Sequence, residues 1–161
     1  MARLAVEKAK DVHRRYPRLS FPIDMESLAD DEGCKVLDWP FVDPVREVKR
    51  GKWIDLAENL DDKERRHLIA HAFAHHLLHS GNQLSFHQWQ KTSLLKQERE
   101  AEECAAHILM PEWEVERLGV IPVWEFSDYF GVPEELVERR LTQFATAAEL
   151  SRWSRLNESE D

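Results

Sequence analysis

The sequence lacks the features that would place it in a membrane or disulfide-rich class. None of its apolar runs approaches the roughly 18 residues needed to cross a membrane. Its 161 residues include only two cysteines, Cys34 and Cys104, which lie far apart and are expected to be reduced thiols. The segment from Met1 to Glu7 has no apolar core of signal-peptide length, so we expect a cytoplasmic protein.

Positive charge is also scarce. The chain has 22 Lys and Arg residues against 31 Asp and Glu residues, which gives a formal net charge of -9. A broad nucleic-acid-binding face needs clustered Lys and Arg to contact phosphates, so direct nucleic-acid binding is not expected. The length suffices for one domain with a proper core and a small appendage.

Hydrophobic periodicity and turn residues predict a mainly helical α+β fold with a small sheet of about three strands. The expected helices cover residues 2–16, 24–33, 61–79, 92–110, 112–118, 122–130 and 133–149. The expected strands are a single strand over 34–39 and a hairpin of 45–49 with 52–56. Residues 81–92 are expected to form a loop anchored by Phe86 and Trp89, and residues after about Arg155 to be frayed.

Two histidines one helical turn apart carry the strongest chemical signal. In an α-helix, His75 lies about 40° round the axis from His71, so both imidazoles can bind one metal ion. This is the geometry of the zinc-peptidase motif His-Glu-x-x-His, in which the Glu is the general base. Here Ala72 stands at the Glu position. Alone, the pair is weak evidence, because a His on a packed helix face is more often a hydrogen-bonded core residue than a ligand.

The next helix offers a third ligand from a group of four carboxylates. These are Glu98, Glu100, Glu102 and Glu103. Glu98 lies within about 60° of the middle of the apolar face of that helix, whereas Glu103 points away. A solvated face is the alternative for all four, and it fits Glu103 well and Glu98 least. We predict Glu98 as the third ligand, with a fourth position for water, and Glu102 as a hydrogen-bond acceptor for the outer nitrogen of a ligating His.

The remaining histidines of this helix compete less well as ligands. Three histidines on consecutive turns span about 12 Å, which is too long for one tetrahedral ion with bonds of about 2 Å. We therefore expect His79 to be structural or to lie on the substrate side, and His76 to be turned away. His67 is disfavoured as a ligand for the same reason.

Two segments together carry a longer motif. They are Ala70-His71-Ala72-Phe73-Ala74-His75-His76-Leu77-Leu78-His79 and Glu98-Arg99-Glu100-Ala101-Glu102-Glu103-Cys104-Ala105-Ala106-His107-Ile108-Leu109-Met110-Pro111. They resemble the ImmA/IrrE family of metallopeptidases, which shows Ala-His-Glu-x-x-His-x-Leu-Leu-His and then Glu-x-x-Ala-Asn-x-Phe-Ala-Ala-x-Leu-Leu-Met-Pro. The resemblance runs weakly back to about Pro22 and forward to Leu141, and it leaves residues 1–20 and 150–161 uncovered.

The resemblance implies a zincin-like fold with His71, His75 and Glu98 as zinc ligands, although manganese or another divalent ion suits the same donors. Residues 1–111 would form the metallopeptidase domain, and 112–161 a helix-turn-helix-like subdomain packed on it. The implied protein substrate is a helix-turn-helix transcriptional repressor, cleaved to release genes of a mobile element, a prophage or a stress response.

The chain departs from the family pattern most seriously at Ala72. Loss of the base that takes a proton from the attacking water commonly lowers the rate by roughly two to four orders of magnitude or more. Two explanations compete: a deliberately inactivated form of an active peptidase, and a natural pseudoenzyme that keeps the metal for structure. The intact ligand set favours the first. Glu102, where the family has Asn or Asp, and Cys104, where it has Phe, are lesser departures.

Three functions remain open at this stage. The first is a zinc-dependent endopeptidase of a repressor, here catalytically disabled, and the second is a non-catalytic zinc-stabilised protein that sequesters the repressor. The third is DNA binding through residues 122–141, which have a helix-turn-helix rhythm. The helix that would read the DNA begins with Glu134 and Glu135, which repel phosphate. Only Arg139 and Arg140 favour DNA binding, so this function ranks below the other two.

Overall fold

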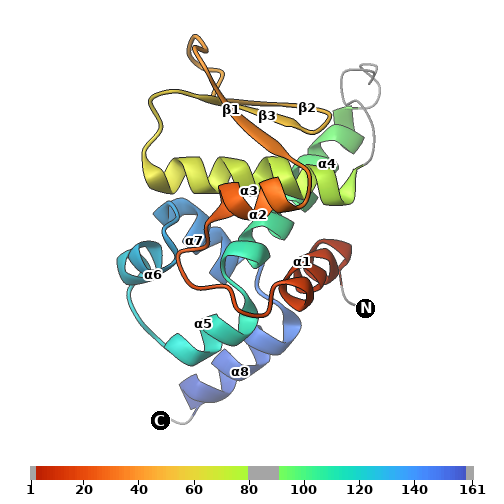
Figure 1. Cartoon of the computed structure of the whole chain (residues 1–161). Helices are drawn as coiled ribbons and strands as arrows, with labels where there is room; N and C mark the ends of the chain where they lie inside the picture. The colour runs from red at the N-terminus through yellow and green to blue at the C-terminus, as the bar shows by residue number, and fades with distance from the viewer. Residues whose placement is uncertain (1–2, 80–90, 159–161) are drawn as a thin grey trace.

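The computed structural model describes residues 3–79 and 91–158, which form eight helices and one three-stranded sheet (Figure 1). The helices are α1 (Leu4–Arg15), α2 (Met25–Asp31), α3 (Asp62–Leu78), α4 (Lys91–Leu109), α5 (Glu112–Leu118), α6 (Val123–Phe130), α7 (Glu134–Leu141) and α8 (Ala147–Glu158). The strands are β1 (Lys35–Trp39), β2 (Glu47–Arg50) and β3 (Trp53–Ala57). The predicted mainly helical α+β fold with a small sheet is confirmed. None of these helices has the length and apolar composition needed to span a membrane.

The sheet has the order β1-β3-β2, with β1 parallel and β2 antiparallel to the central strand β3. The β2–β3 hairpin turns at Gly51, whose φ of +57° lies in the left-handed region that glycine adopts without strain. Residues alternate between half-buried and exposed along the edge strand β2, and Glu47 and Lys49 are the half-buried ones. The sheet lies over α3 in Figure 1, so the inward side of β2 faces that helix.

The core lies between α3, α4 and α1, where α4 packs against both of the other helices. Small residues line the contact, and Ala70, Ala74, Ala101 and Ala105 are all buried. Without long side chains between them, the backbones of α3 and α4 approach closely, which brings polar groups on their shared rim within reach of one another. The loop predicted over 81–92, with Phe86 and Trp89, falls mostly outside the described residues, and its last two positions belong to α4.

The C-terminal region corrects the sequence prediction. The single helix expected over 133–149 is wrong, because α7 ends at Leu141 and α8 begins at Ala147. The backbone N–H of Glu149 donates to the Thr146 hydroxyl at 3.1 Å, and the Glu149 carboxylate accepts from the Thr146 N–H at 3.0 Å. This capping box starts a new helix at the Thr-Ala-Ala-Glu signal of 146–149. Residues 155–158, expected to be frayed, belong to α8.

A fully buried ion pair joins the two C-terminal helices. Arg140 and Glu149 have no exposed side-chain surface, and the guanidinium donates to both carboxylate oxygens at 2.7 and 2.8 Å. Arg140 also donates through Nε to the carbonyl of Met110 at 2.9 Å, which ties α7 to the end of α4. Burial opposes ionisation of Glu149, but Arg140 outweighs it and holds the pKa of Glu149 below its usual range. The predicted domain division after residue 111 stays a prediction.

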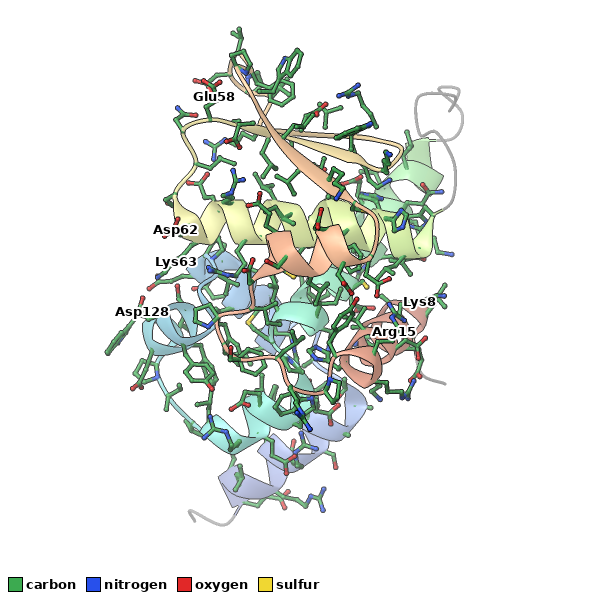
Figure 2. The ribbon with its side chains drawn as sticks, viewed as in Figure 1. Lys8, Arg15, Glu58, Asp62, Lys63 and Asp128 are labelled. Atoms are coloured by element: carbon green, nitrogen blue, oxygen red, sulfur yellow. The ribbon has the colours of Figure 1, made fainter. Side chains whose placement is uncertain are left out.

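Removing one partner of this pair should be strongly destabilising. We expect Glu149→Gln to lower the free energy of unfolding by about 3–5 kcal/mol, because Arg140 is left buried without a counter-charge. The matched control is Lys63→Ala, which removes the exposed pair of Lys63 with Asp128 at 2.6 Å between α3 and α6 (Figure 2). The control should cost less than about 1 kcal/mol. Urea unfolding measures both, and equal losses would contradict the assignment.

A buried histidine should make stability depend on pH. The Nε2–H of His107 donates to the Phe144 carbonyl at 2.7 Å, and burial lowers the pKa of His107 to about 3. Between pH 6.5 and 3 the unfolded chain therefore binds a proton that the folded chain does not, so this group destabilises the fold as pH falls. The unfolding free energy of the chain should fall between pH 7 and pH 5. In His107→Gln this fall should be smaller by about 1–2 kcal/mol. An unchanged pH dependence in urea unfolding would refute a neutral His107.

Candidate metal centre

Helix α3 presents two imidazoles on neighbouring turns. The helix is capped by Asp61, whose Oδ1 accepts from the Glu64 N–H at 2.8 Å. One turn separates His71 from His75, and their ring centroids lie 4.9 Å apart. His75 is buried and His71 is half-buried, so one edge of the pair opens towards the surface.

Helix α4 brings a single carboxylate to both rings. Glu98 Oε2 lies 2.9 Å from His71 Nε2, and Glu98 Oε1 lies 2.8 Å from His75 Nε2. His71, His75 and Glu98 each offer one donor atom, and these three atoms lie within 4.8 Å of one another. Tetrahedral ligands at about 2 Å from an ion lie roughly 3–4 Å apart, so the donor set fits a zinc-sized divalent cation. The structure thus brings together the three residues predicted as ligands.

The electrostatics of the group favour positive charge. Burial disfavours protonation of His71, but hydrogen bonds to Glu102 and Glu98 outweigh it and raise the pKa of His71 to about 10. Hydrogen bonds from His71 and His75 hold the pKa of Glu98 well below its usual range, even though 53% of the Glu98 side chain is exposed. A cation at this point is therefore stabilised by carboxylates already in place.

Glu102 lies one turn beyond Glu98 and extends the pattern. Its Oε1 lies 3.5 Å from His71 Nδ1, the outer ring nitrogen, and 2.5 Å from His67 Nε2. Its Oε2 accepts from Arg139 of α7 at 3.1 Å. Burial would raise the pKa of Glu102, but His67 and His71 outweigh it and hold that pKa below its usual range. Glu102 thus lies beside the outer nitrogen of His71, and its role as an acceptor for a ligating His stays a prediction.

Sequence reasoning missed two partners of Glu102. His67 was set aside as a ligand, but the structure gives it a hydrogen bond to this carboxylate. Arg139 was considered only as a DNA contact, yet its guanidinium lies 5.0 Å from the centroid of the Phe144 ring and donates to Glu102. A signal for His67 was present, because four-residue spacing on both helices predicts two facing rows of side chains.

The expected solvated position of Glu103 is wrong. Its side chain does point away from the histidines, but Glu103 is only 6% exposed and pairs with Arg3 at 3.0 Å. We expected Glu103 to be more exposed than Glu98. The structure shows the reverse, because Glu98 is the more exposed carboxylate. The reason is α1, which packs against the other side of α4 and covers Glu103.

Three further residues of α3 can now be placed. Ala72 is fully buried, with 0% of its surface exposed. His76 is exposed, in agreement with a side chain turned away from the site. His79 ends the helix with its ring 5.5 Å from that of His75, and its buried Nε2 has no hydrogen-bond partner among the described residues.

The site also contains a carboxylate from the sheet that the sequence analysis did not single out. Glu47 is the first residue of the edge strand β2 and is half-buried. Burial raises the pKa of Glu47, and the nearby imidazoles of His71 and His75 partly oppose the rise. No local pattern identifies this residue, because only the pairing of β2 with β3 over α3 brings it to the site.

A polar cavity opens beside His71. It has a volume of about 520 Å³, and its lining includes His71, Glu98, Glu102 and Arg139. A second hollow of about 580 Å³ lies beside His67. The histidine and glutamate rows therefore border open space beside both His67 and His71. Two imidazoles and a carboxylate at such an opening have the form of a metallopeptidase centre.

Comparison with known proteins agrees with the form of a metallopeptidase centre. The model of the IrrE N-terminal-like domain, Peptidase_M78, matches residues 29–142. The chain belongs to this peptidase family, which confirms the resemblance found in its sequence. No curated protein matches the chain significantly.

A solved structure shares the fold. A Mycobacterium tuberculosis transcriptional regulator superposes with a TM-score of 0.65 at 17% sequence identity, over 86% of this chain and 46% of that one. This chain thus spans about half the length of that protein. At this identity the similarity shows a common fold and nothing further.

The donor set leads to a prediction for metal binding. We expect the chain to bind about one zinc ion, and Glu98→Gln to weaken that binding at least about tenfold, because an amide is a poorer ligand than a carboxylate. The control is Glu100→Gln, which changes a carboxylate of the same helix that pairs only with Lys96 among the described residues. Equilibrium dialysis with metal analysis measures both variants. Full zinc affinity in Glu98→Gln would remove this residue from the ligand set.

Proposed function

We propose that the chain is built as a zinc-dependent endopeptidase that cleaves a helix-turn-helix transcriptional repressor, and that Ala72 disables most of its activity. The observation that carries the proposal is the convergence of His71, His75 and Glu98 at an open cavity in a member of a peptidase family. Manganese or another divalent ion would suit the same donors. The proposed compartment is the cytoplasm, which suits the free buried thiols of Cys34 and Cys104.

Each residue of the centre has a proposed role. His71 and His75 would hold the ion through Nε2, and Glu98 through its carboxylate. Glu102, whose Oε1 lies 3.5 Å from the outer nitrogen of His71, would accept from it and orient that ring. The ion, when bound, polarises the scissile carbonyl. His79, at the end of α3 with an unpartnered buried nitrogen among the described residues, is the proposed substrate-side group.

The missing group is the general base. A Glu side chain at position 72 would take a proton from the attacking water and pass it to the leaving amine. An alanine methyl cannot do this, so we expect the chain to cleave about two to four orders of magnitude more slowly than a form with the carboxylate.

Restoring that carboxylate tests the proposal. We expect Ala72→Glu to raise cleavage of the repressor encoded beside the gene at least about 100-fold, and a chelator to abolish it. The matched control is Ala72→Gln, which has the same size but cannot accept the proton. Because Ala72 is fully buried, the thermal midpoints of all three forms are compared first. Gel analysis of the repressor then measures cleavage.

The competing function is non-catalytic binding of the repressor. Here the ion would hold α3 and α4 together, and no form of position 72 would cleave. Zinc bound stoichiometrically by Ala72→Glu, together with an intact repressor after long incubation, would decide for this alternative. Co-elution of the chain with the repressor in gel filtration would then be its positive sign.

DNA binding through the C-terminal helices loses its remaining support. The two arginines that favoured it are both engaged, Arg140 with Glu149 in the interior and Arg139 with Glu102. The N-terminal turn of α7 keeps its exposed Glu134 and Glu135, which repel phosphate. We propose that α7 supports the metal centre instead.

A further inference from the structure

The sheet that covers α3 supplies a further carboxylate near the centre, Glu47. Glu47 lies on β2, the edge strand of the sheet that covers α3 (Figure 1). Along this strand Glu47 and Lys49 are half-buried, whereas Val48 and Arg50 are exposed. The alternation directs the side chain of Glu47 towards the helix rather than towards solvent. The contact between β2 and α3 agrees with this direction, and so does the electrostatic influence of His71 and His75 on Glu47.

The Glu47 carboxylate is half-buried without a partner. No residue in the described part of the chain donates a hydrogen bond to it or forms an ion pair with it. Carboxylates removed from water are costly unless they are paired or bound to a cation or an ordered water. Every other carboxylate of the centre is paired, Glu98 with two imidazoles and Glu102 with His67 and Arg139. The carboxylate oxygens of Glu47 can therefore accept hydrogen bonds from water at the place where the reaction would occur.

The position of Glu47 differs from that of a ligand. The group of donors within 4.8 Å of one another contains His71, His75 and Glu98, but not Glu47. A general base acts from such a place, because it must reach the attacking water by a hydrogen bond without occupying the position of that water. A fourth ligand would instead close the site.

We propose that Glu47 takes over, at a lower rate, the general-base role that Ala72 cannot fill. The inference rests on the proposed peptidase function. The Glu47 carboxylate accepts one proton from water as the water oxygen bonds to the scissile carbonyl carbon. The proton then passes to the amide nitrogen as the C–N bond breaks. The products are one carboxylic acid and one amine, which exchange a proton to become a carboxylate and an ammonium group, and Glu47 returns to its ionised form.

The test compares four forms: the chain itself, Glu47→Gln, Ala72→Glu, and both changes together. With the chain in excess over the repressor and incubation over a day, we expect slow chelator-sensitive cleavage by the chain. Glu47→Gln should reduce it at least about tenfold, while in the Ala72→Glu background the same change should cost less than about threefold. The matched control is Glu58→Gln, which changes an exposed carboxylate just beyond the C-terminal end of β3, labelled in Figure 2.

Two readouts do not depend on cleavage. The zinc affinity of Glu47→Gln should stay within about twofold of that of the chain, whereas loss of a ligand would lower it tenfold or more. Acetohydroxamate binds zinc through its oxygens and has N–H and O–H groups that a neighbouring carboxylate can accept. Its affinity for the zinc-loaded chain, measured by calorimetry, should fall about tenfold in Glu47→Gln and stay unchanged in Glu58→Gln.

The outcomes separate this inference from the proposed function. If Ala72→Glu cleaves but the chain does not, or if the chain and Glu47→Gln cleave equally, the role of Glu47 is refuted and the peptidase stands. A tenfold loss of zinc affinity in Glu47→Gln would make Glu47 a ligand and likewise overturn the inference. If no form cleaves although all bind zinc, the proposed function itself fails.

Discussion

The contact between α3 and α4 imposes the constraint on which the site depends. Two rows of polar side chains meet there, histidines on one helix and glutamates on the other. Each carboxylate lies between two imidazoles, with Glu98 between His75 and His71, and Glu102 between His71 and His67. Such a row is stable only if positive charge resides within it, as protons or as a metal ion. Protons and a metal compete for the same nitrogens, so metal binding and pH are linked at this centre.

The rest of the molecule keeps these two helices in register. Helix α1 closes the far side of α4 and buries Glu103 against Arg3. Helix α7 reaches the centre through two neighbouring arginines with different tasks. Arg140 joins the end of α4 to α8 through Met110 and Glu149, and Arg139 holds Glu102. The helix-turn-helix rhythm of this region therefore produces a helix whose two arginines are both held by contacts within the chain, one of them beside the candidate metal centre.

The sequence predicts local features of this protein well and tertiary ones poorly. The His71 and His75 pair, the Glu98 position and the extent of α3 follow from helical periodicity and neighbouring residues. The break between α7 and α8 also had a local signal, the capping box at Thr146, which apolar periodicity alone overlooks. The burial of Glu103 had none, because it depends on α1, about 100 residues earlier in the chain. Glu47 is of the same kind, since the position of an edge strand over a helix is a property of the fold.

The substitution at position 72 changes the electrostatics of the centre as well as its chemistry. With a Glu at this position, the carboxylates of Glu47, Glu98 and Glu102 would gain a fourth close neighbour of like charge. Like charges in a partly desolvated site oppose the ionisation of both groups. Either Glu47 or the carboxylate introduced at position 72 would therefore tend to keep its proton. With Ala72 that repulsion is absent, and what still raises the pKa of Glu47 is its burial, followed by the nearby carboxylates of Glu98 and Glu102. The change that removes a base from the helix therefore leaves the carboxylate on the strand more readily ionised, which is the state in which it can accept a proton from water.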